Sequence, residues 1–433
     1  MSPLTVVGVF PAPEVRTGGH RRFLELLSGL SARGHEVILL HDPDVAGADS
    51  PLPGRSLPLF GRERFGPAWW RYLLAARRGR PRLLELVPRR RAAETDHLRV
   101  VIAFSATDYF AAKSIARGLG APLLFALRSN NVTVHRRFGM LYKESKRFKR
   151  MQRFFQGIWK RFLERRIARG SDRLVVQTEF DRADVAVRNR VAADRIRVIP
   201  NSMRASWFDP DLAGTNRSDR LRRLLFVGAF GERKGIQHLL PATRILVKER
   251  GLDLELELIG FGKLEPWIES YVKDQGLTQA VTVAGRVQAP LRRMAASDLL
   301  VVPSLYDSFP NTVLEALYVG TPVIGSDTSG IKAILSEPEL LFEPESAEAI
   351  ADRIEPIARD RERYRRVKEL CAARRGRFDL RCRRRRRRGG RRWGLLRGLR
   401  LFGFDLDLGL GLDLDFGFVD LDLDLVHAVF RLQ

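Results

Sequence analysis

The chain has 433 residues, of which 45% are hydrophobic and 29% are charged. This length predicts more than one globular domain, since a single hydrophobic core seldom grows beyond about 250 to 300 residues. A formal charge of +25 predicts an anionic partner, such as a nucleic acid, a lipid headgroup or a phosphorylated small molecule. The two cysteines, Cys371 and Cys382, are too few for a disulfide framework or a Cys-rich metal site, which is typical of a reducing cytoplasm. We interpret the opening MSPLTVVGVF as a buried strand and not as a signal peptide, and no uncharged apolar run approaches the roughly 18 residues of a membrane span.

Short apolar runs alternate with helical patterns along the chain, which predicts parallel sheets connected by crossover helices. In the first half we expect strands at residues 4–10, 36–42, 99–104, 121–128, 173–178 and 195–201. In the second half we expect strands at residues 222–230, 254–260, 280–285, 298–304, 321–327 and a last, weak one at 339–344. The polar segment 205–220 has the Pro, Gly, Asn and Asp of a linker. We therefore predict an α/β protein of two doubly wound domains, residues 1–204 and residues 221–380.

Two segments of the first half, residues 61–91 and 128–170, combine basic and aromatic side chains. In the second of them, helical spacing places five apolar side chains on one face: Phe148, Met151, Phe155, Ile158 and Phe162. One interpretation is a buried stripe with a solvated basic rim. The other is a surface that binds anionic lipid and presents a lipid-linked acceptor, because cationic and aromatic side chains together suit a membrane interface. Nucleic acid is not the expected partner, since no nucleic-acid-binding motif accompanies the charge.

Residues 298–327, DLLVVPSLYDSFPNTVLEALYVGTPVIGSD, form one predicted strand–helix–strand unit. Asp307 lies in the loop after the first strand, where open α/β sheets bind ligands, and the helix that begins near Asn311 directs free amides into the same crevice. A diphosphate suits those amides, and Glu315 can accept hydrogen bonds from a ribose diol. Taken alone, the two acids are more simply explained as a helix cap and a solvated side chain, so the neighbouring motifs decide.

Three further motifs precede this unit, with the sequences FVGAFGERKGIQHLLPATRIL, LELIGFGKLEP and VTVAGRV. In this order and spacing, the sequence closely resembles the retaining glycosyltransferases of family 4. The resemblance implies the GT-B fold, in which two Rossmann-like domains face each other across a cleft and the carboxyl half binds a nucleotide diphosphate sugar. Asp307 and Glu315 match the Glu-x7-Glu motif of the family, which implies that Glu315 holds the ribose and that Asp307 lies near the donor sugar. Lys234 would meet the diphosphate, together with the amides of Asn311, Thr312 and Val313.

Three positions depart from the family pattern. Asp307 is one methylene shorter than the usual Glu, which changes its reach toward the sugar by about 1.5 Å. Ala229 stands where an arginine is common, and we expect Arg233 to replace that charge. After the strand at 99–104, Phe104 and Ser105 stand where many relatives carry a histidine, so a general-base histidine is not expected there.

The amino half contains PAPEVRTGGHRRFLELLSGLSARGHEVILL, which is similar to the Gly-Gly loop and the following helix of the family. We expect Gly18 and Gly19 to let the backbone approach the phosphates or the transferred sugar, because a side chain would block that approach. For the glycine pair alone, a plain turn is the simpler interpretation.

The sequence thus predicts a retaining glycosyltransferase of cell-surface glycan or glycolipid synthesis, with Asp307 and Lys234 as catalytic residues and with neither a metal nor another cofactor. Lys234, Arg233 and the helix amides would stabilise the departing diphosphate. The resemblance favours a front-face route, in which the leaving group and the incoming hydroxyl share one side of the sugar. We expect a cytoplasmic enzyme held peripherally on the inner face of the cell membrane. The alternatives are a non-catalytic protein of this fold that binds membranes or polyanions, and a sugar-nucleotide epimerase, whose acids would need another layout.

From about Arg381 the composition changes abruptly to an Arg-rich run followed by Asp/Leu repeats. Residues 381–433 have no helical period and no turn signals between strands, so we predict a disordered low-complexity tail. A sharper hypothesis is a repetitive GC-rich coding region read in a shifted frame. The 12 Arg and 7 Asp of these residues account for +5 of the charge, which leaves +20 on the rest of the chain.

Overall fold

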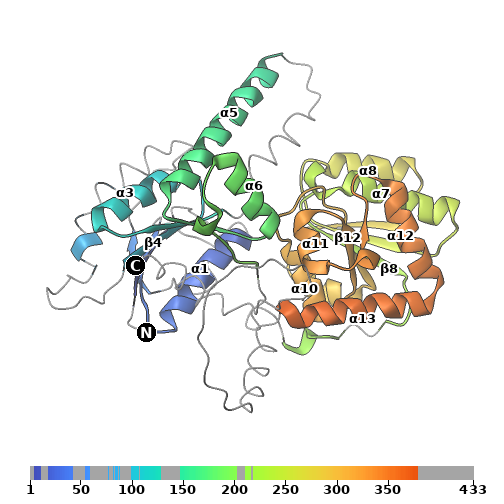
Figure 1. Cartoon of the computed structure of the whole chain (residues 1–433). Helices are drawn as coiled ribbons and strands as arrows, with labels where there is room; N and C mark the ends of the chain where they lie inside the picture. The colour runs from blue at the N-terminus through green and yellow to red at the C-terminus, as the bar shows by residue number, and fades with distance from the viewer. Residues whose placement is uncertain are drawn as a thin grey trace, which may run out of the picture.

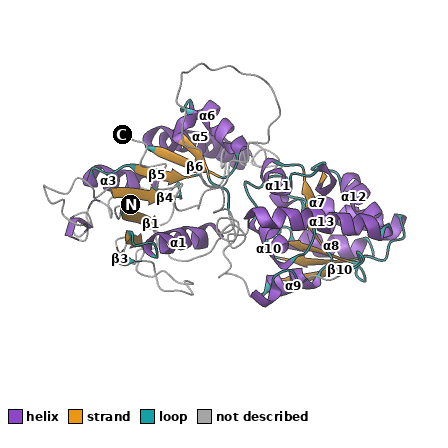
Figure 2. Ribbon diagram, turned by 60° about the horizontal axis from the view of Figure 1, so that its bottom comes forward, coloured by secondary structure: helices purple, strands orange, loops and turns teal. Residues whose placement is uncertain are grey.

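The computed structural model describes residues 4–10, 18–41, 54–58, 99–106, 108–127, 147–201, 210–215 and 218–378, with a few positions between 77 and 87. These residues form two α/β domains, each with a parallel sheet in its interior and helices outside it (Figures 1 and 2). The predicted fold class is therefore confirmed. The predicted tail at 381–433 and most of the basic segment 61–91 lie outside the described residues.

The amino domain contains a parallel sheet whose described strands run in the order β3-β2-β1-β4-β5-β6-β7. These strands are β1 Thr5–Phe10, β2 Glu36–His41, β3 Arg55–Pro58, β4 Arg99–Ala103, β5 Leu123–Ala126, β6 Arg173–Val176 and β7 Ile196–Val198. The longer helices around it are α1 Gly18–Ser31, α3 Tyr109–Leu119, α5 Arg147–Gly170 and α6 Glu179–Asn189. Apart from the two outer strands, β3 and β7, the strands are nearly continuous apolar runs, because helices cover both faces of the sheet.

The carboxyl domain repeats this plan with the strand order β10-β9-β8-β11-β12-β13. Its strands are β8 Arg223–Val227, β9 Glu255–Ile259, β10 Val281–Gly285, β11 Leu299–Val302, β12 Val323–Ser326 and β13 Leu341–Phe342. Its helices are α7 Ile236–Arg244, α8 Glu265–Asp274, α9 Pro290–Ala296, α10 Asn311–Val319, α11 Ser329–Leu335, α12 Ala347–Arg359 and α13 Arg361–Phe378. This order is that of a doubly wound dinucleotide-binding sheet, in which the chain reverses direction beside the first strand.

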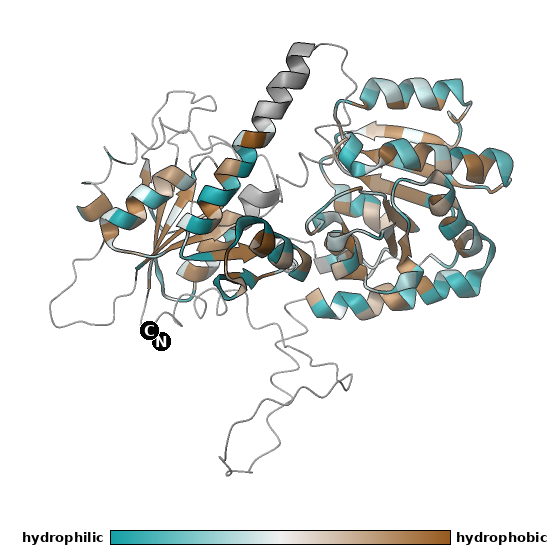
Figure 3. Cartoon of the chain, turned by 45° about the horizontal axis from the view of Figure 1, so that its top comes forward, coloured by the Kyte–Doolittle hydropathy of each residue, from teal (hydrophilic) through white to brown (hydrophobic). Residues whose placement is uncertain are grey.

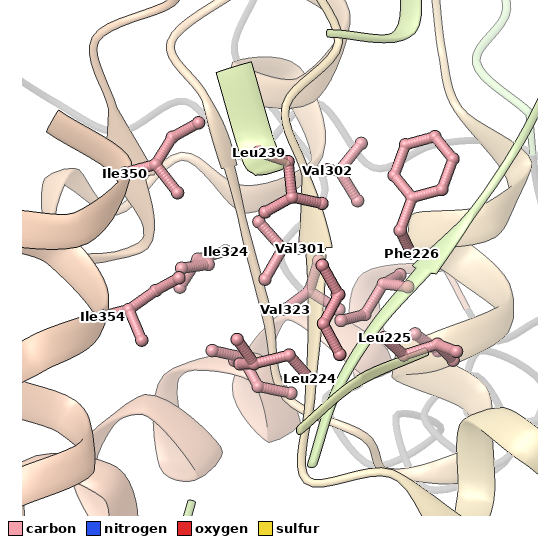
Figure 4. Close-up of a cluster of buried hydrophobic side chains, with 14 of the residues drawn as sticks. Leu224, Leu225, Phe226, Leu239, Val301, Val302, Val323, Ile324, Ile350 and Ile354 are labelled. Atoms are coloured by element: carbon pink, nitrogen blue, oxygen red, sulfur yellow. The ribbon is translucent and has the colours of Figure 1, made fainter. Parts of the chain in front are cut away.

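The core of the carboxyl domain lies between its sheet and the helices packed on it. Figure 4 shows side chains of β8, β11 and β12 meeting α12 residues such as Ile350 and Ile354, both of which are fully buried. Hydrophobic residues gather on the strands, and hydrophilic ones on the outer helices (Figure 3). Among the described residues, none of the helices combines the length and the apolarity that crossing a bilayer requires.

The predicted strands are present in both domains, and their ends differ from the observed ones by at most three residues. Strand β3 was not predicted, because its sequence RSLP is short and ends in proline, which weakens a strand pattern. The chain passes from the first sheet to the second between β7 and β8, and the predicted linker 205–220 lies within that passage. Residues 205–209 and 216–217 of the linker are outside the described part.

Candidate active site

The strand order of the carboxyl domain reverses between β8 and β11, which are neighbours in the sheet although they are far apart in the chain. In open α/β sheets the crevice at the carboxyl ends of two such strands is the usual ligand site. The loop after β8 carries Arg233 and Lys234, and the loop after β11 carries Asp307. The Leu305 amide donates a hydrogen bond to the Arg233 carbonyl at 2.8 Å, which ties the two loops together.

Lys234 and Asp307 form an ion pair in which Nζ lies 2.5 Å from Oδ2. The two side chains are only 18% and 17% exposed, so water screens this pair less than it screens a surface pair. The sequence predicted both residues for the site, and the structure brings them into direct contact. Asp307 is therefore paired with a lysine and is not a side-chain cap of the following helix, which has none.

Glycines allow the backbone segments of this crevice to pack closely. Gly235 has a φ of 73°, and a Cβ there would lie 1.8 Å from the carbonyl oxygen of Pro303. Gly260 has a φ of 151°, and its Cβ would lie 1.8 Å from the carbonyl oxygen of Gly228. Other residues would be strained at both positions and would also push the loops apart.

Helix α10 begins at Asn311, directly after Pro310, and ends at Gly320, which has a φ of 88°. Its N-cap makes no side-chain hydrogen bond, and the amides of a first helical turn have no partner within their own helix. Asn311 and Thr312 are half-buried, whereas the Val313 side chain is completely buried in the core. Glu315 follows in the next turn and is half-buried.

The sequence analysis did not predict Phe261, an exposed aromatic residue at the same edge of the sheet. Phe261 follows β9 and is 52% exposed, and the guanidinium carbon of Arg286, which follows β10, lies 4.0 Å from the centre of its ring. Phe261 stands inside the motif LELIGFGKLEP, and its position between two glycines was the available signal. The ring and the guanidinium offer a flat surface for stacking.

The carboxyl ends of β6 and β7 in the amino domain supply a polar bridge to the second domain. Asn201 accepts a hydrogen bond from Gln177 Nε2 at 2.8 Å through its Oδ1. Its Nδ2 donates to the Phe309 carbonyl and to Asn311 Oδ1, both at 3.0 Å. Gln177 and Asn201 were also not predicted as site residues, although both lie at the carboxyl ends of predicted strands, 173–178 and 195–201.

Asp181 is the most buried acid near this end of β6, in the first turn of α6. Its Oδ2 accepts a hydrogen bond from the Thr178 hydroxyl at 2.7 Å, and its Oδ1 has no hydrogen-bond partner in the described part of the chain. Burial raises the pKa of Asp181 to about 6. A neutral acid is easier to bury than a carboxylate, which explains the direction of this shift.

The glycine pair of the amino domain lies where β1 leads into α1. Gly18 and Gly19 are the first residues of this helix, so the structure places them in its opening turn and not in the loop before it. At the end of β4, the ring of Phe104 lies 4.7 Å from that of Phe23 and 6.1 Å from that of Phe10. The position that holds a histidine in many relatives is thus part of an aromatic cluster beside α1.

Comparison with known proteins identifies relatives of both domains. The family model described as glycosyl transferase 4-like domain matches residues 17–202, and that described as glycosyl transferases group 1 matches residues 210–372. A D-inositol 3-phosphate glycosyltransferase of Paenarthrobacter aurescens is 32% identical over 184 residues, which are 40% of this chain and 45% of that protein. An alpha-D-kanosaminyltransferase of Streptomyces kanamyceticus is 22% identical over 223 residues, 49% of this chain and 58% of that protein. The chain thus spans about half the length of the curated relatives it matches.

Solved structures of similar proteins extend the likeness over most of the chain. Anabaena HepE in complex with UDP and glucose has a TM-score of 0.64 at 14% identity, covering 89% of this chain and 98% of that one. A sucrose-phosphate synthase from Thermosynechococcus elongatus has a TM-score of 0.63 at 21% identity, covering 90% of this chain and 99% of that one. At these identities the likeness concerns the fold. Together with the two matching family models, it shows that the chain belongs to the group 1, or family 4, glycosyltransferases of the GT-B fold.

Proposed function

We propose that this protein transfers a sugar from a nucleoside diphosphate sugar to an acceptor hydroxyl, with retention at the anomeric carbon. The observation that carries the proposal is the Lys234–Asp307 pair beside the first turn of α10, at the switch point between β8 and β11. Solved relatives of the same fold hold UDP, or UDP-glucose, in their structures. The epimerase alternative and the non-catalytic alternative are not favoured, because the family models of both domains describe transferases.

In the proposed reaction, positive groups of the carboxyl domain hold the diphosphate as it leaves. Lys234 offers an ammonium, Arg233 lies beside it, and the first amides of α10 offer hydrogen-bond donors. The bond between the anomeric carbon and the phosphate oxygen breaks, and the acceptor oxygen bonds to that carbon from the same face. The acceptor proton passes to the departing phosphate oxygen. We propose that these groups suffice without a bound metal, with Asp307 near the sugar.

The remaining parts of the donor have matching positions at the same sheet edge. We propose that Glu315 accepts hydrogen bonds from the ribose hydroxyls and that the base stacks beside Phe261 and Arg286. Gly18 and Gly19, in the opening turn of α1, are the proposed contacts of the amino domain with the phosphates or the transferred sugar. Their lack of side chains permits a close backbone approach.

We also propose that helix α5 holds the enzyme on an anionic membrane, where a lipid-linked acceptor would be presented. Ile158, Trp159 and Phe162 are 52%, 44% and 49% exposed. Ile158 and Phe162 belong to the predicted apolar stripe and are thus not buried, whereas the side chains of Phe148, Met151 and Phe155 lie outside the described part. Exposed basic residues surround the exposed apolar side chains: Lys160, Arg161, Arg165 and Arg166. Aromatic and cationic groups on one helix favour an anionic interface.

The Glu315→Gln variant tests the donor site with UDP as the probe. Because a hydrogen bond to a charged group contributes about 1.5 to 3 kcal/mol, we expect the variant to bind UDP about 10- to 100-fold more weakly in calorimetry. Glu257→Gln is the matched control, since Glu257 is a partly buried acid of β9 whose Oε1 lies 3.5 Å from Arg293. Unchanged UDP affinity in the Glu315 variant would remove this residue from the site, and absence of UDP binding to the wild type would contradict a UDP-sugar donor.

A further inference from the structure

The Asn201 bridge uses every polar group of one side-chain amide. The oxygen accepts from the amino domain, and both N–H groups donate to the carboxyl domain. Rotating the amide by 180° would turn its oxygen toward two acceptors and its nitrogen toward a donor, so a single orientation satisfies all three partners. The bridge therefore specifies one arrangement of the groups around it.

Burial makes this arrangement energetically important. Gln177 and Asn201 are 7% and 9% exposed, so water replaces a lost partner poorly. A buried polar group that loses its partner keeps the cost of desolvation without the compensating hydrogen bond. A movement of either domain that breaks the bridge leaves such groups on both sides of it.

Rigid elements hold the bridge at each end. On the amino-domain side, Gln177 directly follows β6, and the Ile199 amide donates to the Val176 carbonyl at 2.7 Å, which continues the pairing of β6 and β7 toward Asn201. On the other side, Phe309 lies two residues before α10 and Asn311 is its first residue. The Asn311 side chain accepts from Asn201, and the N-cap residue Pro310 makes no side-chain hydrogen bond to the helix.

We infer that Gln177 and Asn201 are positioning residues, which fix the first turn of α10 relative to the amino domain. This inference rests on the proposed function, in which that turn binds the diphosphate and the amino domain presents the acceptor. The two residues act through Asn311 and Phe309. Without the bridge, the two domains would sample a wider range of orientations, and the site would be less preorganised for the donor.

The test compares Asn201→Ala and Gln177→Met with a matched control, Asn189→Ala. Asn189 is also a buried amide that donates twice, to Glu164 Oε1 and to the Val185 carbonyl, but these partners lie within the amino domain. Spin labels on Val187→Cys and Glu269→Cys, at exposed positions of the two domains, report the interdomain distance distribution in a Cys382→Ser background. Calorimetry with UDP and thermal unfolding of the same variants complete the comparison.

We expect Asn201→Ala to broaden the distance distribution and to raise the Kd of UDP about tenfold. Gln177→Met should also broaden the distance distribution and raise the Kd of UDP, but by a smaller factor, because Gln177 contacts Asn201 only from the amino-domain side. Asn189→Ala should lower the thermal midpoint and leave both quantities at their wild-type values. If Asn201→Ala does not fold, Gln177→Met carries the test.

Two outcomes would contradict the positioning role or the proposed donor, and the measurements distinguish them. Wild-type distances and wild-type UDP affinity in both bridge variants, with only a lowered thermal midpoint, would reduce the bridge to a structural contact. A wild type that fails to bind UDP would contradict the proposed donor, whereas the distance distributions would still decide whether the bridge orients the domains.

Discussion

In the Lys234–Asp307 pair, the Asp307 carboxylate occupies the ammonium group that we propose binds the diphosphate of the donor, so Asp307 and the diphosphate compete for Lys234. A diphosphate that approaches the ammonium of Lys234 offers more negative charge than the Asp307 carboxylate, so Lys234 can exchange one partner for the other without becoming an unpaired charge. Asp307 would then be released toward the donor sugar. Because both groups are largely buried, the exchange takes place where electrostatic interactions are stronger than in bulk water.

This exchange predicts a selective loss of affinity in Lys234→Ala. We expect UDP to bind about 10- to 100-fold more weakly, because a charged hydrogen bond is lost, and uridine to bind nearly as it does to the wild type, because it carries no phosphate. Calorimetry with the two ligands measures the difference. The control is Arg222→Ala, which removes the 3.1 Å ion pair of Arg222 with Glu255 at the opposite edge of the same sheet. Equal losses for UDP and uridine would contradict the assignment of Lys234 to the diphosphate.

The residues that the sequence predicted for the site are those that follow a recognisable strand within one motif. Lys234, Asp307 and Glu315 come to one edge because parallel strands all end at the same edge of a sheet. The roles of Asn201 and Phe261 depend on partners that the sequence pattern does not indicate. Asn201 meets Asn311, which is 110 positions away, and Phe261 meets Arg286 across the ends of two strands. Polar or aromatic residues in loops carry no periodic signal, so only the folded chain reveals these contacts.

At the level of single elements, α5 has two dissimilar faces in its described half. Ile167 and Ala168 are buried against the amino domain, and Leu163 is half-buried beside them. Trp159 and Phe162, with ring centres 5.6 Å apart, lie on the exposed side. Figure 1 shows α5 extending beyond the sheet that its carboxyl end packs against. An exposed aromatic pair with basic neighbours at such a position can enter a headgroup layer without moving the core.

We therefore predict that the protein sediments with vesicles of anionic lipid at low salt, and that binding decreases at high salt. Each basic side chain near an anionic surface contributes about 1 kcal/mol, and this attraction is screened by salt. The double variant Trp159→Ser, Phe162→Ser should weaken sedimentation, because it removes the apolar part of the contact. Trp267→Ser, a change at a 37% exposed tryptophan of α8, is the control. Binding that ignores lipid charge and salt would refute the proposal, as would self-association that accounts for all of the sedimented protein.

Comparing the observed elements with the predicted ones shows which sequence patterns predict an element correctly. Long apolar strands and α10, with Pro310 before it and Gly320 after it, were predicted because their local preferences agree with the fold. The first turn of α1 was predicted as a loop because the sequence resembles the Gly-Gly loop of the family, yet Gly18 and Gly19 lie within the helix, where each glycine carries a local cost. Packing of the following apolar residues, such as Phe23 and Leu27, outweighs that local cost.

At the level of the whole molecule, the last described helix, α13, packs on the carboxyl domain. Cys371 Sγ accepts a hydrogen bond from the Val323 amide, at 3.3 Å, and Arg374 Nε donates to the Ile334 carbonyl at 2.6 Å. At the end of the helix Phe378 is 6% exposed and its ring meets that of Phe309 edge-on, with centres 5.9 Å apart. Phe309 is also the residue whose carbonyl accepts from Asn201, so the last described residue of the chain supports the junction between the domains.

These contacts predict where the chain can be shortened. Deleting residues 381–433 retains every residue of α13 and its described contacts, so we expect the thermal midpoint and the UDP affinity to stay within experimental error of the full chain. Phe378→Ala should instead destabilise the domain by about 3 to 5 kcal/mol, the usual cost of truncating a buried phenylalanine. Denaturant unfolding of both variants measures this contrast, with full-length protein as the reference. If the deletion lowers the unfolding midpoint as far as Phe378→Ala does, residues 381–433 stabilise the native protein, and the hypothesis of a tail read in a shifted frame is wrong.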